Sequence, residues 1–255
     1  MTRIKICGLT EPQHALAAAQ AGADFIGFVF APSRRQVSAE KTQQMLKIIN
    51  GFKNKPSTVG VFVNAPFDEI NRIADYCHLD WVQLSGDETW DYCAHIERPV
   101  IKTVHITVTK EDSEYLPPFK NPAPPSPPVE RGARGERLET NASLLEQITA
   151  GYQTLTSHKF ICLIDSKVKD RYGGTGQRYD WQLASAITAK FPVLIAGGLR
   201  PDNVGTLIEE IHPWGVDVST GVESKGQKDE AKITAFIEAV RNAEKIVIHG
   251  NLHRE

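Results

Sequence analysis

The chain has 255 residues, of which 41% are hydrophobic and 24% are charged, and its formal net charge is −2. This composition is typical of a globular protein long enough to bury a substantial core. The balanced charge excludes a strongly basic surface of the kind that binds nucleic acid, and no apolar run approaches the roughly 18 residues of a membrane-spanning helix.

Short β-rich runs alternate with helix-like stretches along the chain. In chain order we predict strand Arg3–Ile6, helix Pro12–Ala21, strand Phe25–Phe30, helix Ala39–Ile49, strand Thr58–Val63, helix Phe67–Cys77, strand Trp81–Leu84, helix Glu88–Ile96, strand Val100–Ile106, a weaker helical signal over Lys110–Leu116, strand Lys159–Ile164, helix Trp181–Ala189, strand Pro192–Ala196, helix Pro201–Ile211, strand Gly215–Val218 and helix Asp229–Ala243. Strands that alternate with helices need crossover connections and form a parallel sheet. Eight such units in this length predict a single (β/α)8 TIM barrel over residues 1–255.

One segment interrupts this alternation. Pro117–Asn141 reads PPFKNPAPPSPPVERGARGERLETN and holds almost no large apolar residue. Such a stretch cannot bury enough surface to offset its ordering entropy. We expect a disordered, low-complexity insertion on the barrel rim between the fifth and sixth strands, after which Ala142–Ala150 completes the fifth helix. The alternative is a Pro-rich ligand for a partner domain.

The cysteines and the N-terminus indicate a reducing compartment. The cysteines are Cys7, Cys77, Cys93 and Cys162, and none are in C-x-x-C spacing. A chain of this length does not depend on disulfides. The first residues, MTRIKICGLTEPQ, hold no apolar stretch of signal-peptide length. We therefore expect a cytoplasmic protein with reduced thiols.

Two strand ends carry candidate catalytic groups. The active site of such a barrel lies at the carboxyl ends of the strands, and side chains alternate between the two faces of each strand. Cys7 ends the first strand on the same face as Lys5, and Asp165 ends the sixth strand on the same face as Leu163. Both therefore point into the predicted barrel mouth. The alternatives are a small buried thiol and a solvated or helix-capping carboxylate.

Glycine-rich segments follow the last three predicted strands. They are YGGTG at Tyr172–Gly176, AGGL at Ala196–Leu199 and STGVE at Ser219–Glu223. Glycine lets backbone amides approach an anion, and the loops after strands seven and eight often bind phosphate in this fold. Arg34 and Arg35, after the second strand, could hold a carboxylate. The alternatives are plain tight turns and a pair of solvated arginines.

Motifs for metals and nucleotide cofactors are missing. The eight histidines are scattered along the chain, and there is no G-x-S-x-G, no G-x-G-x-x-G and no Walker A motif. We therefore expect no metal and no cofactor, so that side chains alone would carry the chemistry.

Eight sequence blocks resemble the phosphoribosylanthranilate isomerases, enzymes of tryptophan biosynthesis. They are KICGLT (Lys5–Thr10), GADFIGFVFAPSRRQVS (Gly22–Ser38), VGVFVN (Val59–Asn64), VQLSGDE (Val82–Glu88), LIDSKV (Leu163–Val168), YGGTGQRYDW (Tyr172–Trp181), AGGLRPDNV (Ala196–Val204) and VDVSTGVE (Val216–Glu223). These blocks run through nearly the whole chain, and KICG combined with a later Asp and YGG-x-G is highly specific for this family.

The resemblance implies a role for each matching residue. Cys7 matches the family's general base, Asp165 its general acid, and Arg35 the arginine that holds the anthranilate carboxylate. The other matches lie in loops and are Gly174, in the mobile loop beside the acid, and Gly198, Gly221 and Val222, in the phosphate-binding loops.

The resemblance also implies a reaction, which is an Amadori rearrangement of N-(5-phosphoribosyl)anthranilate. The ligand would be this phosphosugar–anthranilate molecule, with no cofactor, no nucleic acid and no membrane, and the protein would be a monomer or a homodimer. Cys7 has to work as a thiolate, so it needs a setting that lowers its pKa. Lys5, on the same strand face, is our candidate for that influence.

Two features depart from the family pattern, and two other functions compete. Ser85 stands where the family often has histidine, which affects contacts to the anthranilate ring, and the Pro117–Asn141 insertion is additional. One rival is another enzyme of the phosphate-binding barrel group, such as indole-glycerol-phosphate synthase. The other is a non-catalytic phosphosugar-binding barrel, against which the presence of both Cys7 and Asp165 argues.

Overall fold

The computed structural model describes residues 1–52, 54–108, 141–155, 159–168, 185 and 187–252. Eight strands close into a barrel in the order of the sequence, and every neighbouring pair is parallel. The strands are β1 (Arg3–Cys7), β2 (Phe25–Val29), β3 (Ser57–Phe62), β4 (Trp81–Leu84), β5 (Val100–Val108), β6 (Phe160–Val168), β7 (Val193–Ala196) and β8 (Gly215–Val218). The predicted (β/α)8 barrel is confirmed.

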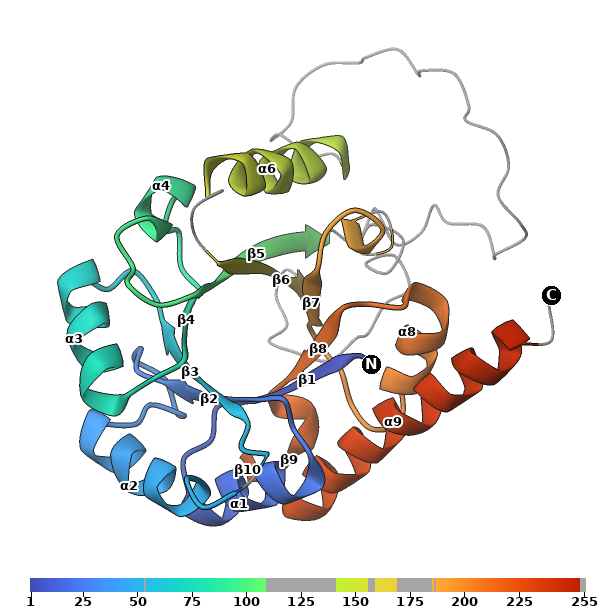
Figure 1. The fold of residues 1–255 in the computed structure, drawn as a ribbon, viewed down its shortest axis with the longest axis horizontal. Helices are drawn as coiled ribbons and strands as arrows, with labels where there is room; N and C mark the ends of the chain where they lie inside the picture. The colour runs from blue at the N-terminus through green and yellow to red at the C-terminus, as the bar shows by residue number, and fades with distance from the viewer. Residues whose placement is uncertain (53, 109–140, 156–158, 169–184, 186, 253–255) are drawn as a thin grey trace.

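Helices surround this ring of strands (Figure 1). They are α1 (Pro12–Ala21), α2 (Ala39–Ile49), α3 (Phe67–Cys77), α4 (Trp90–Cys93), α6 (Asn141–Thr154), α8 (Val204–Ile211) and α9 (Glu230–Leu252). After β8 come a short 3₁₀ helix, η1 (Thr220–Val222), and the small antiparallel pair β9 (Glu223–Ser224) and β10 (Gln227–Lys228). The last helix, α9, lies along both α1 and α8 and so closes the helical ring.

The sequence predicts the ends of several elements, but β5 and β6 extend to Val108 and Val168, beyond their predicted ends, so Asp165 lies inside β6 and does not end it as predicted. α1 and α2 keep their predicted ends because Pro12 occupies the first turn, Gly22 takes the left-handed cap at φ 91° and Ser38 caps Lys41. The helix predicted over Glu88–Ile96 is shorter because Thr89 caps it. The Glu88 carboxylate instead accepts bonds from backbone amides in the preceding loops.

Three predictions fall partly or wholly outside the described residues. The weak helical signal at Lys110–Leu116 lies outside them, and so does Pro117–Asn141 except for Asn141, which begins α6. Of the helix predicted over Trp181–Ala189 the structure describes residues 185 and 187–189, of which 185, 187 and 188 are helical. The position of α6 between β5 and β6 agrees with the predicted completion of the fifth helix.

The apolar side chains form two clusters on opposite faces of the strands. Ile4 and Ile6 join the large cluster between strands and helices, as the alternation predicts. A second cluster fills the barrel interior; its members are Phe25, Val59, Trp81, Ile101, Ile161, Leu163, Leu194 and Ala196. Polar side chains occupy the interior positions nearer the carboxyl ends of the strands. The barrel interior is therefore filled with apolar side chains and becomes polar towards the carboxyl ends.

Candidate active site

Cys7 ends β1 on the interior face, and its side chain is buried. The neighbouring strand makes room for it at Gly27. A Cβ added to Gly27 would lie 2.9 Å from Cys7 Sγ and 3.2 Å from Lys5 Nζ. Real side chains rarely tolerate such contacts, so the glycine lets the thiol and the ammonium share one small space.

The Lys5 ammonium is fully enclosed and paired with a carboxylate. Its Nζ lies 2.8 Å from Asp217 Oδ1, on the neighbouring strand β8. Burial works to lower the pKa of Lys5, and the charges of Asp217 and Cys7 outweigh burial, so the pKa of Lys5 is raised. Lys5 therefore stays charged beside the thiol.

Our expectation that the pKa of the Cys7 thiol is lowered is wrong. Burial raises the pKa of Cys7, and the Asp217 charge acts in the same direction. Lys5 lowers the pKa of Cys7, as we expected, and Lys228 lowers it more weakly. Together these two charges do not overcome the effect of burial. A thiol removed from water loses the solvation of its charged form, which no sequence pattern reports.

Asp165 lies on β6, one interior position beyond Leu163, and its side chain is 31% exposed. β5 places His105 directly opposite Asp165 in the strand pairing. His105 Nδ1 lies 3.7 Å from Asp165 Oδ2. The structure therefore brings Cys7 and Asp165 to the carboxyl end of one barrel and adds a histidine that the sequence analysis missed. His105 lies two residues after Thr103 on a predicted strand, so the two side chains share one face, and this spacing could have identified it.

A ladder of polar side chains supports this side of the mouth. Ser85 Oγ lies 2.9 Å from both Gln83 Nε2 and Thr103 Oγ1. His105 Nε2 lies 3.1 Å from the Ser85 carbonyl oxygen. Ser85 thus links β4 to β5 and reaches the imidazole beside the acid.

The loops after β7 and β8 touch through glycine. A Cβ on Gly221 would overlap the Leu199 carbonyl oxygen, so only glycine permits this approach. Gly198 adopts φ 63°, and its carbonyl accepts a 3.0 Å bond from Asn203 Nδ2. Within the described chain the Gly198 amide donates no hydrogen bond, and such an amide is suited to an anion. Val222 is fully buried and anchors η1.

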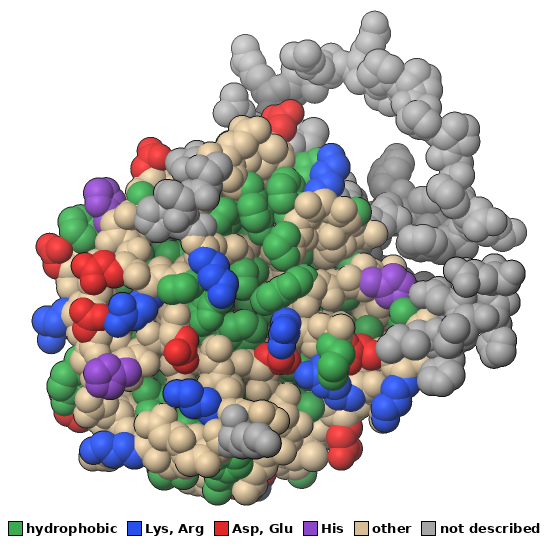
Figure 2. Space-filling model, viewed as in Figure 1, with side chains coloured by type: hydrophobic (Ala, Val, Ile, Leu, Met, Phe, Trp, Pro, Cys, Tyr) green, Lys and Arg blue, Asp and Glu red, His purple; other side chains and the backbone are tan. Residues whose placement is uncertain are grey.

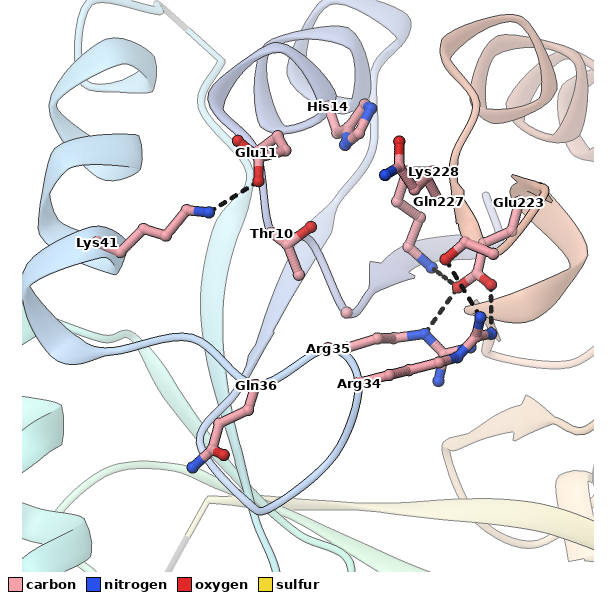
Figure 3. Close-up of a pocket in the computed structure, with 12 residues that line it drawn as sticks. Thr10, Glu11, His14, Arg34, Arg35, Gln36, Lys41, Glu223, Gln227 and Lys228 are labelled. Atoms are coloured by element: carbon pink, nitrogen blue, oxygen red, sulfur yellow. Dashed lines mark hydrogen bonds and ion pairs between the residues drawn. The ribbon is translucent and has the colours of Figure 1, made fainter.

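Arg35 is held by an acidic residue that the sequence analysis did not single out (Figure 3). Its Nε lies 2.7 Å from Glu223 Oε1, and Arg34 and Lys228 contact the same carboxylate at 2.5 Å and 3.1 Å. Burial raises the pKa of Glu223, but the bond from Arg35 and the charge of Lys228 lower it more, so the net pKa is lowered. The stem of Arg35 crosses Gly8, which has φ 75°.

These charged groups line a pocket of about 280 Å³ beside the barrel mouth. His14 comes from α1, Lys41 comes from α2, and Glu11 lies at the end of the loop between β1 and α1. Lys41 pairs with Glu11 at 2.8 Å. The pocket contains Arg35 and Gly8 but neither Cys7 nor Asp165 among its lining residues, so it flanks the candidate catalytic pair and does not contain it.

Comparison with known proteins identifies the family. The family model described as N-(5'-phosphoribosyl)anthranilate isomerase matches residues 4–147 and 136–239. The chain belongs to the phosphoribosylanthranilate isomerase family. An isomerase of this family from Dehalococcoides mccartyi is 40% identical over 244 residues, covering 96% of this chain and 98% of that protein. The isomerase from Moorella thermoacetica is 36% identical, covering 96% and 92%.

Solved phosphoribosylanthranilate isomerases share the fold. The crystal structure from Thermotoga maritima has a TM-score of 0.69 at 32% identity and covers 95% of this chain and all 100% of its own. A second structure, with a TM-score of 0.65 at 30% identity over 95% of this chain and 100% of its own, is described as a complex with reduced 1-(o-carboxyphenylamino)-1-deoxyribulose 5-phosphate.

The structure describes all but one of the residues to which the family resemblance assigns a role. Gly174, and the YGGTG segment that contains it, lies outside the described residues. The described matches are Cys7 on β1, Arg35 after β2, Asp165 on β6, Gly198 after β7 and Gly221 with Val222 in η1. Asp165 lies inside β6, level with the last residue of β7, and the others end or follow barrel strands at the carboxyl side, where enzymes of this fold carry their sites.

The surface adds two observations. On the face drawn in Figure 2, acidic and basic side chains are interspersed, and neither sign gathers into one broad patch among the residues shown in colour. In the part of the chain that the structure describes, none of the helices combines the length and the apolar character needed to cross a bilayer.

Proposed function

We propose that Cys7 and Asp165 catalyse, in this chain, the reaction of its family. That reaction is the Amadori rearrangement of N-(5-phosphoribosyl)anthranilate to 1-(2-carboxyphenylamino)-1-deoxyribulose 5-phosphate. The observation that carries the proposal is the placement of both groups on interior strand positions of one barrel, with the Cys7 thiol at the end of β1 and the Asp165 carboxyl group on β6, level with the last residue of β7. The complex of a solved relative with a reduced form of this product supports the ligand class.

The first step is acid catalysis. Asp165 gives a proton to the ribose ring oxygen, and the C1′–O4′ bond breaks with its electron pair on oxygen. The anthranilate nitrogen supplies its lone pair to C1′, which yields an open-chain Schiff base. Asp165 suits this step because it is partly exposed at the mouth and lies next to the His105 imidazole.

The second step is base catalysis. The Cys7 thiolate takes the proton from C2′, and the electrons of that bond form the C1′=C2′ double bond as nitrogen regains its lone pair. The resulting enolamine tautomerises to the ketone. Lys5 and Lys228 favour the thiolate in the site, while burial opposes it. Lys5 is thus the group on which the base depends most.

Two anionic groups of the substrate need separate partners. We assign the phosphate to the touching loops at Gly198, Gly221 and Val222, where backbone amides and the start of η1 are presented. We assign the anthranilate carboxylate to Arg35. Arg35 would exchange part of its contact with Glu223 for the substrate, while Arg34 and Lys228 remain to neutralise Glu223.

The setting of the enzyme is also a proposal. All four cysteines are unpaired buried thiols, which supports a reducing compartment such as the cytoplasm. A Thermotoga maritima relative is described as a dimeric enzyme from which monomers were generated. We propose a monomer or a homodimer for this chain, to be decided by sedimentation velocity.

Turnover of phosphoribosylanthranilate, followed by loss of its fluorescence, tests the proposal. We expect Cys7→Ala and Asp165→Asn each to reduce kcat by about 10²- to 10⁴-fold. Both variants should still be stabilised against urea by the reduced product analogue. Near-normal turnover in either variant would refute its role. A wild-type protein that binds the analogue but turns nothing over would support the non-catalytic phosphosugar-binding barrel instead.

A further inference from the structure

We propose that His105 is a positioning residue for the acid, because it shares one proton with Asp165 and keeps that carboxyl group able to protonate the substrate. The inference rests on the proposed function. It concerns a side chain that the sequence motifs do not assign to the site. The contacts of His105 on both of its ring nitrogens carry the argument.

The strand pairing places the two side chains together. His105 on β5 and Asp165 on β6 are partners in the parallel register. Both occupy interior positions near the carboxyl end, and their side chains are 25% and 31% exposed. The separation of 3.7 Å between Nδ1 and Oδ2 is within ion-pair distance and longer than a hydrogen bond. Contacts of this kind commonly tighten when a substrate is bound.

The other ring nitrogen determines which protonation states are available. His105 Nε2 lies 3.1 Å from the Ser85 carbonyl oxygen. A carbonyl oxygen only accepts hydrogen bonds, so Nε2 carries the hydrogen in the neutral ring. Nδ1 is then the nitrogen that takes up or releases a proton, and it is the one that faces Asp165.

One proton therefore belongs to the pair. Either Asp165 is a neutral acid beside a neutral imidazole, or it is a carboxylate beside an imidazolium. Both forms have the same net charge, and they differ only in the position of one proton. When Asp165 gives its proton to the ring oxygen O4′, the carboxylate left behind regains a proton from water through Nδ1 before the next turnover, and the proton that Cys7 took from C2′ returns to water, so no net proton is consumed.

The surroundings hold the imidazole in this orientation. Ser85, whose carbonyl fixes Nε2, is itself bonded through Oγ to Gln83 and Thr103, both of which are buried. These hydrogen bonds between β4 and β5 therefore hold the Ser85 carbonyl and the His105 ring in a fixed relative position. A free, solvated imidazole could face Asp165 with either nitrogen, and this ladder selects Nδ1.

Other charged groups near β5 are engaged elsewhere in the described chain. Glu88, after β4, accepts bonds from the amides of Asn64 and Gly86 and pairs with Lys102, which lies on the opposite face of β5 from His105. Asp87 lies 3.4 Å from the Asn64 side-chain amide. Asp165, on β6, is the titratable group that the strand register places against the imidazole.

His105→Gln tests the inference. The glutamine amide can still donate to the Ser85 carbonyl, but it cannot take up a proton. We expect kcat near pH 8 to fall roughly 10- to 100-fold, and the alkaline limb of the kcat profile to move to lower pH, because Asp165 must hold its proton alone. KM should change less, by about twofold. His95→Gln, at an exposed histidine, is the matched control and should leave the profile unchanged.

Two further measurements separate this idea from a structural role and from the proposed function. Adding His105→Gln to Asp165→Asn should cost nothing beyond Asp165→Asn alone, because groups that act as a unit are not additive. Independently of activity, ¹⁵N NMR should show the neutral His105 ring protonated on Nε2. Should His105→Gln unfold, His105→Asn replaces it.

The outcomes are distinct. A wild-type protein without turnover refutes the proposed function, and the Nε2 tautomer then tests the geometry alone. If the wild type turns over and His105→Gln keeps its rate and its pH profile, the inference is overturned. A ring protonated on Nδ1 in the neutral form overturns it as well.

Discussion

Lys5→Met removes a buried positive charge from beside the Cys7 thiol. The Lys5 side chain is fully buried, and its partner Asp217 is 10% exposed. Breaking a buried ion pair by removing one partner costs about 3–5 kcal/mol, because the other charge is left without compensation. Lys5 is also the leading group that lowers the pKa of Cys7, so its loss should raise the pKa of Cys7 further. We expect kcat to fall by about 10²-fold or more, the range of general base catalysis.

A second substitution separates stability from catalysis. Removing both charges, as in Lys5→Met with Asp217→Val, should recover most of the lost stability, since apolar replacements of buried pairs are often neutral. Turnover should stay low, because the thiol still lacks its ammonium neighbour. The free energy of unfolding is measured by urea denaturation, and turnover by substrate fluorescence.

Alkylation of Cys7 by iodoacetamide, followed against pH by peptide mass spectrometry, reports the thiol directly. The other thiols serve as internal references in the same spectra, because burial raises the pKa of Cys77 and Cys93 to about 11 and that of Cys162 to about 12. Lys159→Met, at an exposed lysine that lies over Trp81, is the control and should leave Cys7 alkylation unchanged. An unaltered pH dependence in Lys5→Met, or recovered turnover in the double variant, would refute the reasoning.

Three other predictions concern the rim of the site. Arg35→Gln should raise KM about 10- to 100-fold with kcat nearly unchanged, as expected for the loss of one charged hydrogen bond of about 1.5–3 kcal/mol; Arg34→Gln, at a more exposed arginine, is the control, and equal KM values in the two variants would contradict the assignment. Gly221→Ala should destabilise the protein by about 1–3 kcal/mol in urea and weaken analogue binding, because its Cβ overlaps the Leu199 carbonyl. Gly205→Ala, inside α8 and with only Ala243 nearby at 3.9 Å, should stabilise by about 0.5–1 kcal/mol, and loss of stability there would show that any added methyl group is harmful. Glu223 has a pKa below its ordinary value of 4.5 in the folded chain, so it stabilises the fold above that value and loses this effect as pH falls through the lowered pKa. Glu223→Gln should therefore lose less stability than the wild type between pH 6 and roughly pH 3 in urea unfolding; an equal loss would contradict the role of the Arg35 and Lys228 contacts.

The sequence by itself determined the order of the elements and the direction of the strand side chains. Alternation within β1 and β6 is local, because each side chain points opposite to the one before it. For that reason the strand pattern alone was enough to assign Cys7 and Asp165 to the mouth, and Ile4 and Ile6 to the helix layer. The ends of α1 and α2 were equally local, since their caps depend on adjacent residues.

Only the closed barrel decided which distant groups meet. Arg35 and Glu223 are 188 positions apart in the chain, and they touch because the loops after β2 and β8 flank the end of β1. His105 faces Asp165 because the register of β5 against β6 pairs them, and register depends on packing rather than on either strand alone. The pKa of Cys7 was predicted in the wrong direction for the same reason: the influence of the Lys5 charge follows from one strand, whereas the loss of water around the thiol arises from all the strands that enclose it.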